Sequence, residues 1–177
     1  MLSLLALFSL SEASTCLDSS SSSNTFHLLS GTSTLVTGPD MSSYGPVKAV
    51  YTVSGWTASI PGATWIWDNN KVSSPTKDQT CNFYDSFFVT GAVHEAVLHY
   101  AADNHAYVYV NGVNIGCDKS NGSFTSSTQV KCTVTKYLKT GLNYFQFSVT
   151  NAGSNGSTYS TNPGGLLYKL SVTQRFQ

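Results

Sequence analysis

The sequence predicts an all-β domain, a two-sheet antiparallel sandwich or jelly roll with short loops and at most one short helical turn. Short runs of strand-forming residues recur about every 8 to 12 residues, the spacing typical of such folds. Pairs of glycine and proline, such as Pro61-Gly62 and Pro163-Gly164, separate many of these runs. No stretch repeats its apolar residues with a helical period. We therefore expect strands throughout.

The composition is typical of an extracellular β protein. Of the 177 residues only 10% are charged, against about 25% in an average soluble protein. The formal net charge is zero and the basic residues are scattered, so nucleic acid is not an expected partner. The sequons at Asn121 and Asn155 lie in loop-like stretches, which favours a secreted, glycosylated chain.

The chain divides into three segments. Residues 1–13 are apolar and end in the small residues Ser11 and Ala13. They predict either a signal peptide, cleaved after Ala13, or an ordered apolar arm that assembles with neighbouring copies. This segment is too short to span a membrane, and no other stretch is long enough. Residues 14–25 are predicted to be a Ser-rich linker, and residues 26–177 to form a single β-sandwich domain.

Strand-forming runs place the expected strands along this domain. The predicted strands are 26–30, 33–37, 47–54, 63–67, 82–90, 96–101, 106–110, 113–116, 128–134, 142–150 and 165–173. Tyr, Gln and Ser alternate with Phe, Phe and Val over 144–149, and Tyr alternates with Val over 107–110. Each of these strands is expected to have one buried face and one solvent-facing face. The one helical turn is expected at 137–139.

Residues 95–117 are predicted to form a three-stranded antiparallel meander. The polar turn Asp103-Asn104-His105 separates strands 96–101 and 106–110, and Asn111-Gly112 leads into the third strand. Asn-Gly is the strongest short-range hairpin signal, because a type I′ turn needs a positive φ at both central residues.

Four segments together resemble a known family. Residues 83–89, 96–116, 137–153 and 164–170 resemble a galactose-binding-like β-sandwich, similar to the accessory domains of rhamnosidases and related sugar hydrolases. Residues 63–68, ATWIWD, are similar to the Trp-containing strand that opens those modules. The resemblance implies a jelly roll. It leaves the function open, because the family uses this frame for sugar binding, for calcium-stabilised scaffolding and for packing against a catalytic domain.

Four cysteines allow three disulfide connectivities. They lack the close pairs of a zinc site. Cys117 and Cys132 bracket a polar loop, so we predict that they pair, which leaves Cys16 with Cys81. The alternative is a set of buried free thiols in a reducing compartment.

No constellation of reactive side chains is visible in the sequence. Glycoside hydrolysis needs two carboxylates on either side of the sugar bond, but after Glu12 the only glutamate is Glu95 and most aspartates lie in turns or at strand ends. The histidines are not paired as in zinc proteases, and there is no nucleophile elbow. We predict that the protein is not an enzyme and needs no cofactor, a structural calcium ion excepted.

A sugar site is one hypothesis for the function. Trp65 and Trp67 share one strand face, where an exposed pair would stack on a pyranose ring. The following Asp68 and Asn69 would bond to its hydroxyls. The alternative is that both tryptophans fill the core. By analogy with the family, a calcium ion on Asp68, Asn70 and Asp103 is a further candidate.

The low charge, the sequons and the apolar N-terminal segment favour another function. We predict a non-enzymatic, secreted structural or adhesive glycoprotein that self-assembles into an extracellular filament or coat. Its partners would be copies of itself, joined through the N-terminal segment and the sheet edges. The alternative is a carbohydrate-binding module that binds glycans through the Trp65/Trp67 strand or through the loops at one end of the sandwich.

Overall fold

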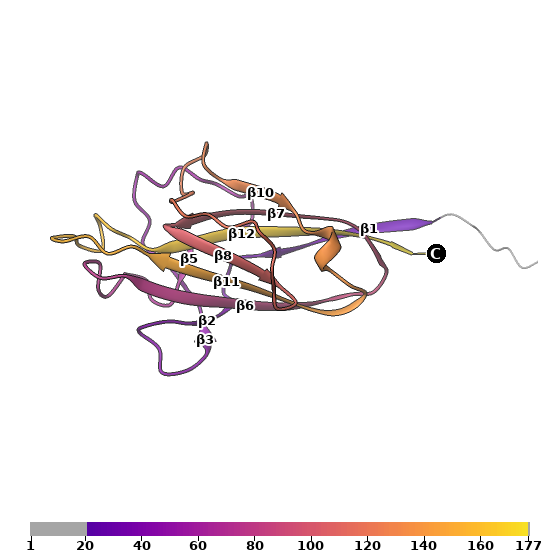
Figure 1. The fold of residues 1–177 in the computed structure, drawn as a ribbon, viewed down its shortest axis with the longest axis horizontal. Coiled ribbons are helices and arrows are strands. Elements are labelled where there is room, and N and C mark those ends of the chain that lie inside the picture. Colours follow the sequence, from indigo (N-terminus) through magenta and orange to yellow (C-terminus); the bar gives the residue numbers. More distant parts are fainter. Residues whose placement is uncertain (1–20, 177) are drawn as a thin grey trace, which may run out of the picture.

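Two antiparallel sheets of six strands each face one another across the core (Figure 1). A computed structural model describes residues 21–176. Sheet A has the order β10-β7-β12-β5-β4, and β1 pairs with the same long strand, β12. Sheet B has the order β3-β2-β6-β11-β8-β9. The predicted fold class, a two-sheet antiparallel sandwich, is confirmed.

Most strands are close to those predicted, but the predicted strands 47–54 and 63–67 are reduced to two residues each, β4 and β5, and β3 is an addition. The strands are β1 (Ser22–Leu29), β2 (Leu35–Thr37), β3 (Gly45–Pro46), β4 (Lys48–Ala49), β5 (Ile66–Trp67), β6 (Gln79–Val89), β7 (Ala92–Asp103), β8 (His105–Val110), β9 (Val113–Asn114), β10 (Val130–Thr133), β11 (Gly141–Asn151) and β12 (Gly165–Phe176). The helical structure of the described residues is a single turn of 3-10 helix, η1 (Thr135–Tyr137). Among these residues no helix is long and apolar enough to cross a membrane.

Aromatic rings from both sheets fill the core. Phe145 and Phe147 point inward from β11, as the alternation predicts, and pack against Tyr168 of β12 with ring centroids 5.6 and 5.2 Å away. Tyr100 of β7 also contacts Phe147, at 5.2 Å. The buried Tyr100 hydroxyl donates a hydrogen bond to the Cys117 carbonyl at 2.6 Å, so its burial leaves no polar group unsatisfied.

The strands β7 and β8 belong to different sheets, which corrects the predicted meander over residues 95–117. β7 pairs with β10 and β12, whereas β8 pairs with β11 and β9. The chain crosses between the sheets at Asn104. Its N–H donates to the Thr150 carbonyl at 3.0 Å, and its side-chain oxygen accepts from the Ala152 N–H at 2.7 Å. These bonds take the place of a hairpin between β7 and β8.

The second turn of this segment is as predicted. Asn111 and Gly112 have φ angles of 51° and 80°, and they join β8 to β9. Along β8, Tyr107 is exposed, and Val108 and Val110 are buried. The alternation in β8 therefore places its tyrosines on the outer face of sheet B.

Strand β1 begins at Ser22, inside the segment predicted to be a linker, so the boundary at residue 26 is wrong. β1 pairs with β12 from Ser22↔Phe176 to Leu29↔Lys169. Backbone hydrogen bonds do not need apolar side chains, so the edge of β12 can order a Ser-rich stretch that has no hydrophobic pattern. The predicted signal peptide or assembly arm, residues 1–13, lies outside the described residues, and so does most of the linker.

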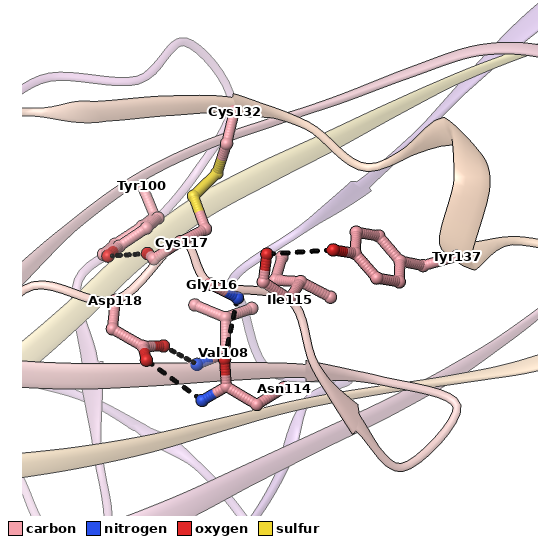
Figure 2. Close-up of a disulfide and its surroundings, with 9 residues drawn as sticks. All are labelled: Tyr100, Val108, Asn114, Ile115, Gly116, Cys117, Asp118, Cys132 and Tyr137. Atoms are coloured by element: carbon pink, nitrogen blue, oxygen red, sulfur yellow. Dashed lines mark hydrogen bonds between the residues drawn. A yellow bond between two sulfur atoms is a disulfide. The ribbon is translucent and has the colours of Figure 1, made fainter.

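A disulfide between Cys117 and Cys132 connects the two sheets (Figure 2). Cys117 follows β9 of sheet B, Cys132 lies in β10 of sheet A, and their Cα atoms are 6.4 Å apart. The Asp118 carboxylate fixes the chain beside it, because it accepts bonds from the Val108 N–H at 3.1 Å and the Asn114 amide at 3.0 Å. This predicted pairing is confirmed.

The predicted bond between Cys16 and Cys81 is not supported. Cys81 is a free, fully buried thiol, and Cys16 lies outside the described residues. The Cys81 sulfur points inward from β6 and is enclosed by Gly38 and the Asp68 carboxylate. Burial and the neighbouring Asp68 raise the pKa of the thiol. The pairing of Cys16 therefore stays a prediction.

Candidate functional site

The two tryptophans of the predicted sugar site lie in the core, so the prediction of an exposed pair is wrong. Trp67 is 0% exposed and packs on Phe83 of sheet B, with ring centroids 5.8 Å apart. Trp65 is 9% exposed, because Trp56 from the loop between β4 and β5 stacks on it at 4.2 Å. That loop covers the strand, so neither ring is available as a platform for a ligand.

The three residues predicted to bind calcium have separate partners. Asp68 accepts a hydrogen bond from the Asp40 N–H at 3.1 Å, and Asp103 accepts one from Trp56 Nε1 at 2.8 Å. The Asn70 carbonyl accepts from the Tyr51 N–H. Within residues 21–176, no three His, Cys, Asp or Glu side chains are grouped so that they could hold a metal ion. This geometry offers no support for a calcium site.

Asp68 and Asn69, in contrast, do line a surface hollow. The hollow has a volume of about 250 Å³ and lies between the loop that joins β2 to β3 and the end of β5. Its other lining residues are Asp40, Met41, Ser42, Ser43, Tyr44 and Lys48. We call it the Asp68 hollow. It brings together a carboxylate, an amide, an ammonium group and an aromatic ring.

The Asp68 side chain supplies a buried acceptor. It is 2% exposed, and its Oδ1 atom has no hydrogen-bond partner in the part of the chain that the structure describes. Burial raises the pKa of Asp68, the Asp40 N–H lowers it, and the Asp40 carboxylate raises it; the Cys81 thiol and the Asn69 N–H lower it further. A buried polar atom without a partner is uncommon. Since this atom has no solvent-accessible surface, Asp68 can contact a ligand only through the small part of its side chain that lines the hollow.

The local sequence explains how Asp68 is held. Gly38, Pro39 and Asp40 form a turn closed by a hydrogen bond of 3.1 Å from the Met41 N–H to the Gly38 carbonyl. Proline at the second position favours such a turn, which directs the Asp40 N–H at Asp68. A Cβ atom on Gly38 would overlap the Asp68 carboxylate. Only glycine therefore lets the turn approach so closely.

Tyr44 supplies the aromatic ring of the hollow. Its side chain is 62% exposed, and its ring meets the ring of Tyr84 at 5.1 Å in an edge-on contact. Tyr84 belongs to β6 and points outward from sheet B. The contact fixes Tyr44 where the hollow meets the outer face of that sheet.

That outer face carries most of the exposed apolar side chains. In the described chain, nine large hydrophobic residues are exposed, and seven of them lie in sheet B or just before β3. The seven are Leu35, Tyr44, Phe88, Tyr107, Val113, Leu142 and Tyr144. We use the name tyrosine face for the outer surface of sheet B that carries Tyr84, Tyr107, Tyr109 and Tyr144. The outer face of sheet A instead has polar pairs such as Thr25–Thr173.

A second hollow opens beside Tyr84. It has a volume of about 460 Å³, and its walls include Leu35, Tyr84 and Tyr144. Asp85 lines it and is held by bonds from the Thr34 hydroxyl, at 3.0 Å, and from the Tyr168 hydroxyl. Burial raises the pKa of Asp85, and these two bonds lower it. We call this second hollow the Tyr84 hollow.

Comparison with known proteins finds likeness in structure alone. No protein-family model and no curated protein sequence matches the chain. A β-glucuronidase from an uncultured Clostridium sp. has a TM-score of 0.51 at 14% identity, over 96% of this chain and 31% of that chain. The likeness is one of fold, a two-sheet antiparallel β-sandwich. The expected similarity to a β-sandwich of a sugar hydrolase is confirmed at the level of the fold.

Two further solved structures are similar at lower scores. A family 35 carbohydrate binding module from Clostridium thermocellum has a TM-score of 0.45 at 11% identity, over 82% of this chain and 97% of that chain. An FMN-binding β-glucuronidase from Facaelibacterium prausnitzii L2-6 has a TM-score of 0.48 at 18% identity, over 84% of this chain and 22% of that chain. The two β-glucuronidases are therefore each matched over less than a third of their length.

The residues that the sequence analysis missed are Tyr44, Lys48, Tyr84 and Tyr144. For Tyr144 a signal was present, since the alternation of β11 places this aromatic residue on the solvent-facing side of the strand. Tyr44 and Lys48 carry no such signal, because they approach Asp68 only through the fold. The predicted glycosylation sites, Asn121 and Asn155, are exposed and lie between strands, and their modification stays a prediction.

Proposed function

We propose that the protein is a carbohydrate-binding module and that the Asp68 hollow is its sugar site. The observation that carries the proposal is the exposed Tyr44 ring beside the buried Asp68 carboxylate, with Asn69 and Lys48 lining the same hollow. A sugar presents an apolar face of C–H groups and an edge of hydroxyls. An aromatic ring suits the face, and charged and amide groups suit the hydroxyls.

This proposal replaces the filament subunit as the main hypothesis. The residues that support sugar binding lie within the described chain, whereas self-assembly depends on residues 1–13, outside it. The proposed residues hold a ligand and carry out no reaction, in keeping with a non-enzymatic module. An extracellular location is part of the proposal, since the Cys117–Cys132 disulfide is compatible with an oxidising compartment.

A glycan array with the wild-type chain and three variants tests the proposal. We expect binding of a subset of glycans, and a loss of affinity of about two- to tenfold in Tyr44→Ala, the size expected for one aromatic contact. Asp68→Asn should weaken binding as well, because it removes one acceptor and alters the charge of the hollow. The matched control is Tyr51→Ala, since Tyr51 is 47% exposed and lies outside the hollow.

Near-ultraviolet circular dichroism would establish that each variant is folded. The proposal is wrong if the wild-type chain binds no glycan, or if a folded Tyr44→Ala variant binds as tightly as wild type.

A further inference from the structure

We infer that the ligand is a linear, uncharged oligosaccharide that extends from the Asp68 hollow across Tyr44 and Tyr84 to the Tyr84 hollow. This inference rests on the proposed function and names its substrate class. It assigns to the tyrosine face the binding of further units of the same chain. A single sugar would fill the Asp68 hollow alone.

The first argument is that the two hollows adjoin. Tyr44 lines the Asp68 hollow, Tyr84 lines the Tyr84 hollow, and their rings are in contact at 5.1 Å. The Tyr44–Tyr84 pair therefore lies between the two hollows, and a linear chain of sugars can pass over both rings. Beyond it, Leu35 and Tyr144 continue the surface, and Tyr144 is 58% exposed.

The second argument is the unequal distribution of exposed apolar side chains. Monomeric proteins seldom expose large continuous apolar patches, and such patches usually mark binding sites. Seven of the nine exposed large hydrophobic residues in the described chain belong to sheet B or to the residue before β3. The pairing register places Leu35 opposite Tyr84, Tyr84 opposite Gln146, and Gln146 opposite Tyr109. One row across four strands therefore carries an aliphatic side chain, two tyrosine rings and one amide.

The third argument concerns charge, and it selects a neutral glycan. The three central strands β6, β8 and β11 contain no Lys, Arg or Glu and one Asp, Asp85. The Asp85 carboxylate is held by Thr34 and Tyr168 of the interior. The polar groups on the face are the His105 imidazole together with amides and hydroxyls, such as those of Asn82 and Gln146. These groups match sugar hydroxyls, whereas anionic ligands are recognised by Arg and Lys. The Asp68 hollow has one ammonium group, Lys48, and two carboxylates, Asp40 and Asp68, so it too presents no excess of positive charge.

Length dependence tests this inference separately from the proposed function. The probes are ladders of linear gluco-, xylo-, manno- and galacto-oligosaccharides from monomer to hexamer, titrated by calorimetry into the wild-type chain, Tyr144→Ala and Tyr51→Ala. We expect affinity for at least one ladder to rise about tenfold or more with length. Tyr144→Ala should remove this gain and keep the wild-type affinity for the monomer. Tyr51→Ala should behave as wild type.

Each other outcome overturns the inference in a recognisable way. If affinity does not depend on length, or if Tyr144→Ala retains the gain, the tyrosine face is not part of the site while the Asp68 hollow stands. If no saccharide binds, the proposed function fails as well. If light scattering shows a wild-type dimer that Tyr144→Ala dissociates while glycan affinity stays unchanged, the face is a protein interface.

Discussion

Trp56 Nε1 donates a hydrogen bond of 2.8 Å to Asp103 Oδ2, and this bond ties the loop between β4 and β5 to the end of β7. It also holds the Trp56 ring against Trp65, which explains why Trp65 is unavailable to a ligand. The other oxygen of Asp103, Oδ1, is buried without a partner in the described chain. Burial raises the pKa of Asp103 to about 6 from an ordinary value of 3.8, and the bond from Trp56 lowers it.

Asp103 should make the stability of the protein depend on pH. Because its pKa is higher in the folded state, its contribution to stability is fully present below about pH 4 and is lost as the pH rises through about 6. At about 1.4 kcal/mol per pKa unit the full effect is about 3 kcal/mol. Asp103→Asn keeps an acceptor for Trp56 and does not titrate. Its free energy of unfolding relative to wild type should therefore rise by about this amount between pH 4 and pH 7.

Urea denaturation of both chains across this range measures the difference. Taking the difference is necessary, because Asp68 and Asp85 also have raised pKa values and His99 has a lowered one, chiefly through burial. These groups are present in both chains. A difference that stays constant with pH would contradict the prediction.

Gly38→Ala should displace Asp68 and so change the shape of the Asp68 hollow. The added methyl group would overlap the Asp68 carboxylate and the Cys81 sulfur. Overpacking of this kind costs about 1–3 kcal/mol, and displacement of Asp68 should also weaken glycan binding. The matched control is Gly31→Ala, since a Cβ atom there meets nothing within 4 Å. Thermal unfolding and glycan titration of both variants measure the effect, and equal behaviour of the two would refute the close approach at Gly38.

Trp67 should matter for stability and not for ligand binding. Trp67→Ala removes a fully buried side chain and should lower the free energy of unfolding by about 3–5 kcal/mol. Trp67→Phe should cost less, because the Trp67 Nε1 atom has no hydrogen-bond partner in the described chain. Denaturant unfolding measures both costs. A folded Trp67→Phe variant that lost its glycan affinity would contradict this prediction and indicate that Trp67 contacts the ligand.

Loss of the disulfide should lower stability through the unfolded chain. The bond closes a loop with a sequence separation of 15 residues, for which the chain-entropy estimate is about 3 kcal/mol. Replacing Cys117 and Cys132 by serine should lower the free energy of unfolding by about this amount, measured in urea.

In non-reducing peptide maps Cys81 should react with iodoacetamide only after unfolding. Rapid reaction of Cys81 in the native protein would contradict its burial.

Features that depend on neighbours along the chain were accessible from the sequence. The alternation in β8 and β11 predicts which side chains face inward, since successive residues of a strand point to opposite faces. The Asn111-Gly112 turn follows from the positive φ angles that such a turn requires. The pairing of Cys117 with Cys132 follows from a short polar loop. These features require little knowledge of distant partners.

Features that depend on distant partners were not accessible. The pairing of β1 with β12 joins opposite ends of the described chain, and a Ser-rich composition gives no sign of it. Whether β7 and β8 share a sheet is decided by their partners β12 and β11, because both arrangements have the same side-chain alternation. Trp65 is covered only because Trp56 stacks on it.

The sequence by itself determined a sandwich of strands, their buried faces and the turn that closes β8 onto β9. Only the tertiary structure decided where a ligand can bind. It buried Trp65 and Trp67, and it brought Tyr44 and Lys48 to Asp68 through the turn at Gly38. The physical reason is that periodicity and turn chemistry act between neighbouring residues, whereas exposure and the convergence of side chains depend on which distant segments pack together.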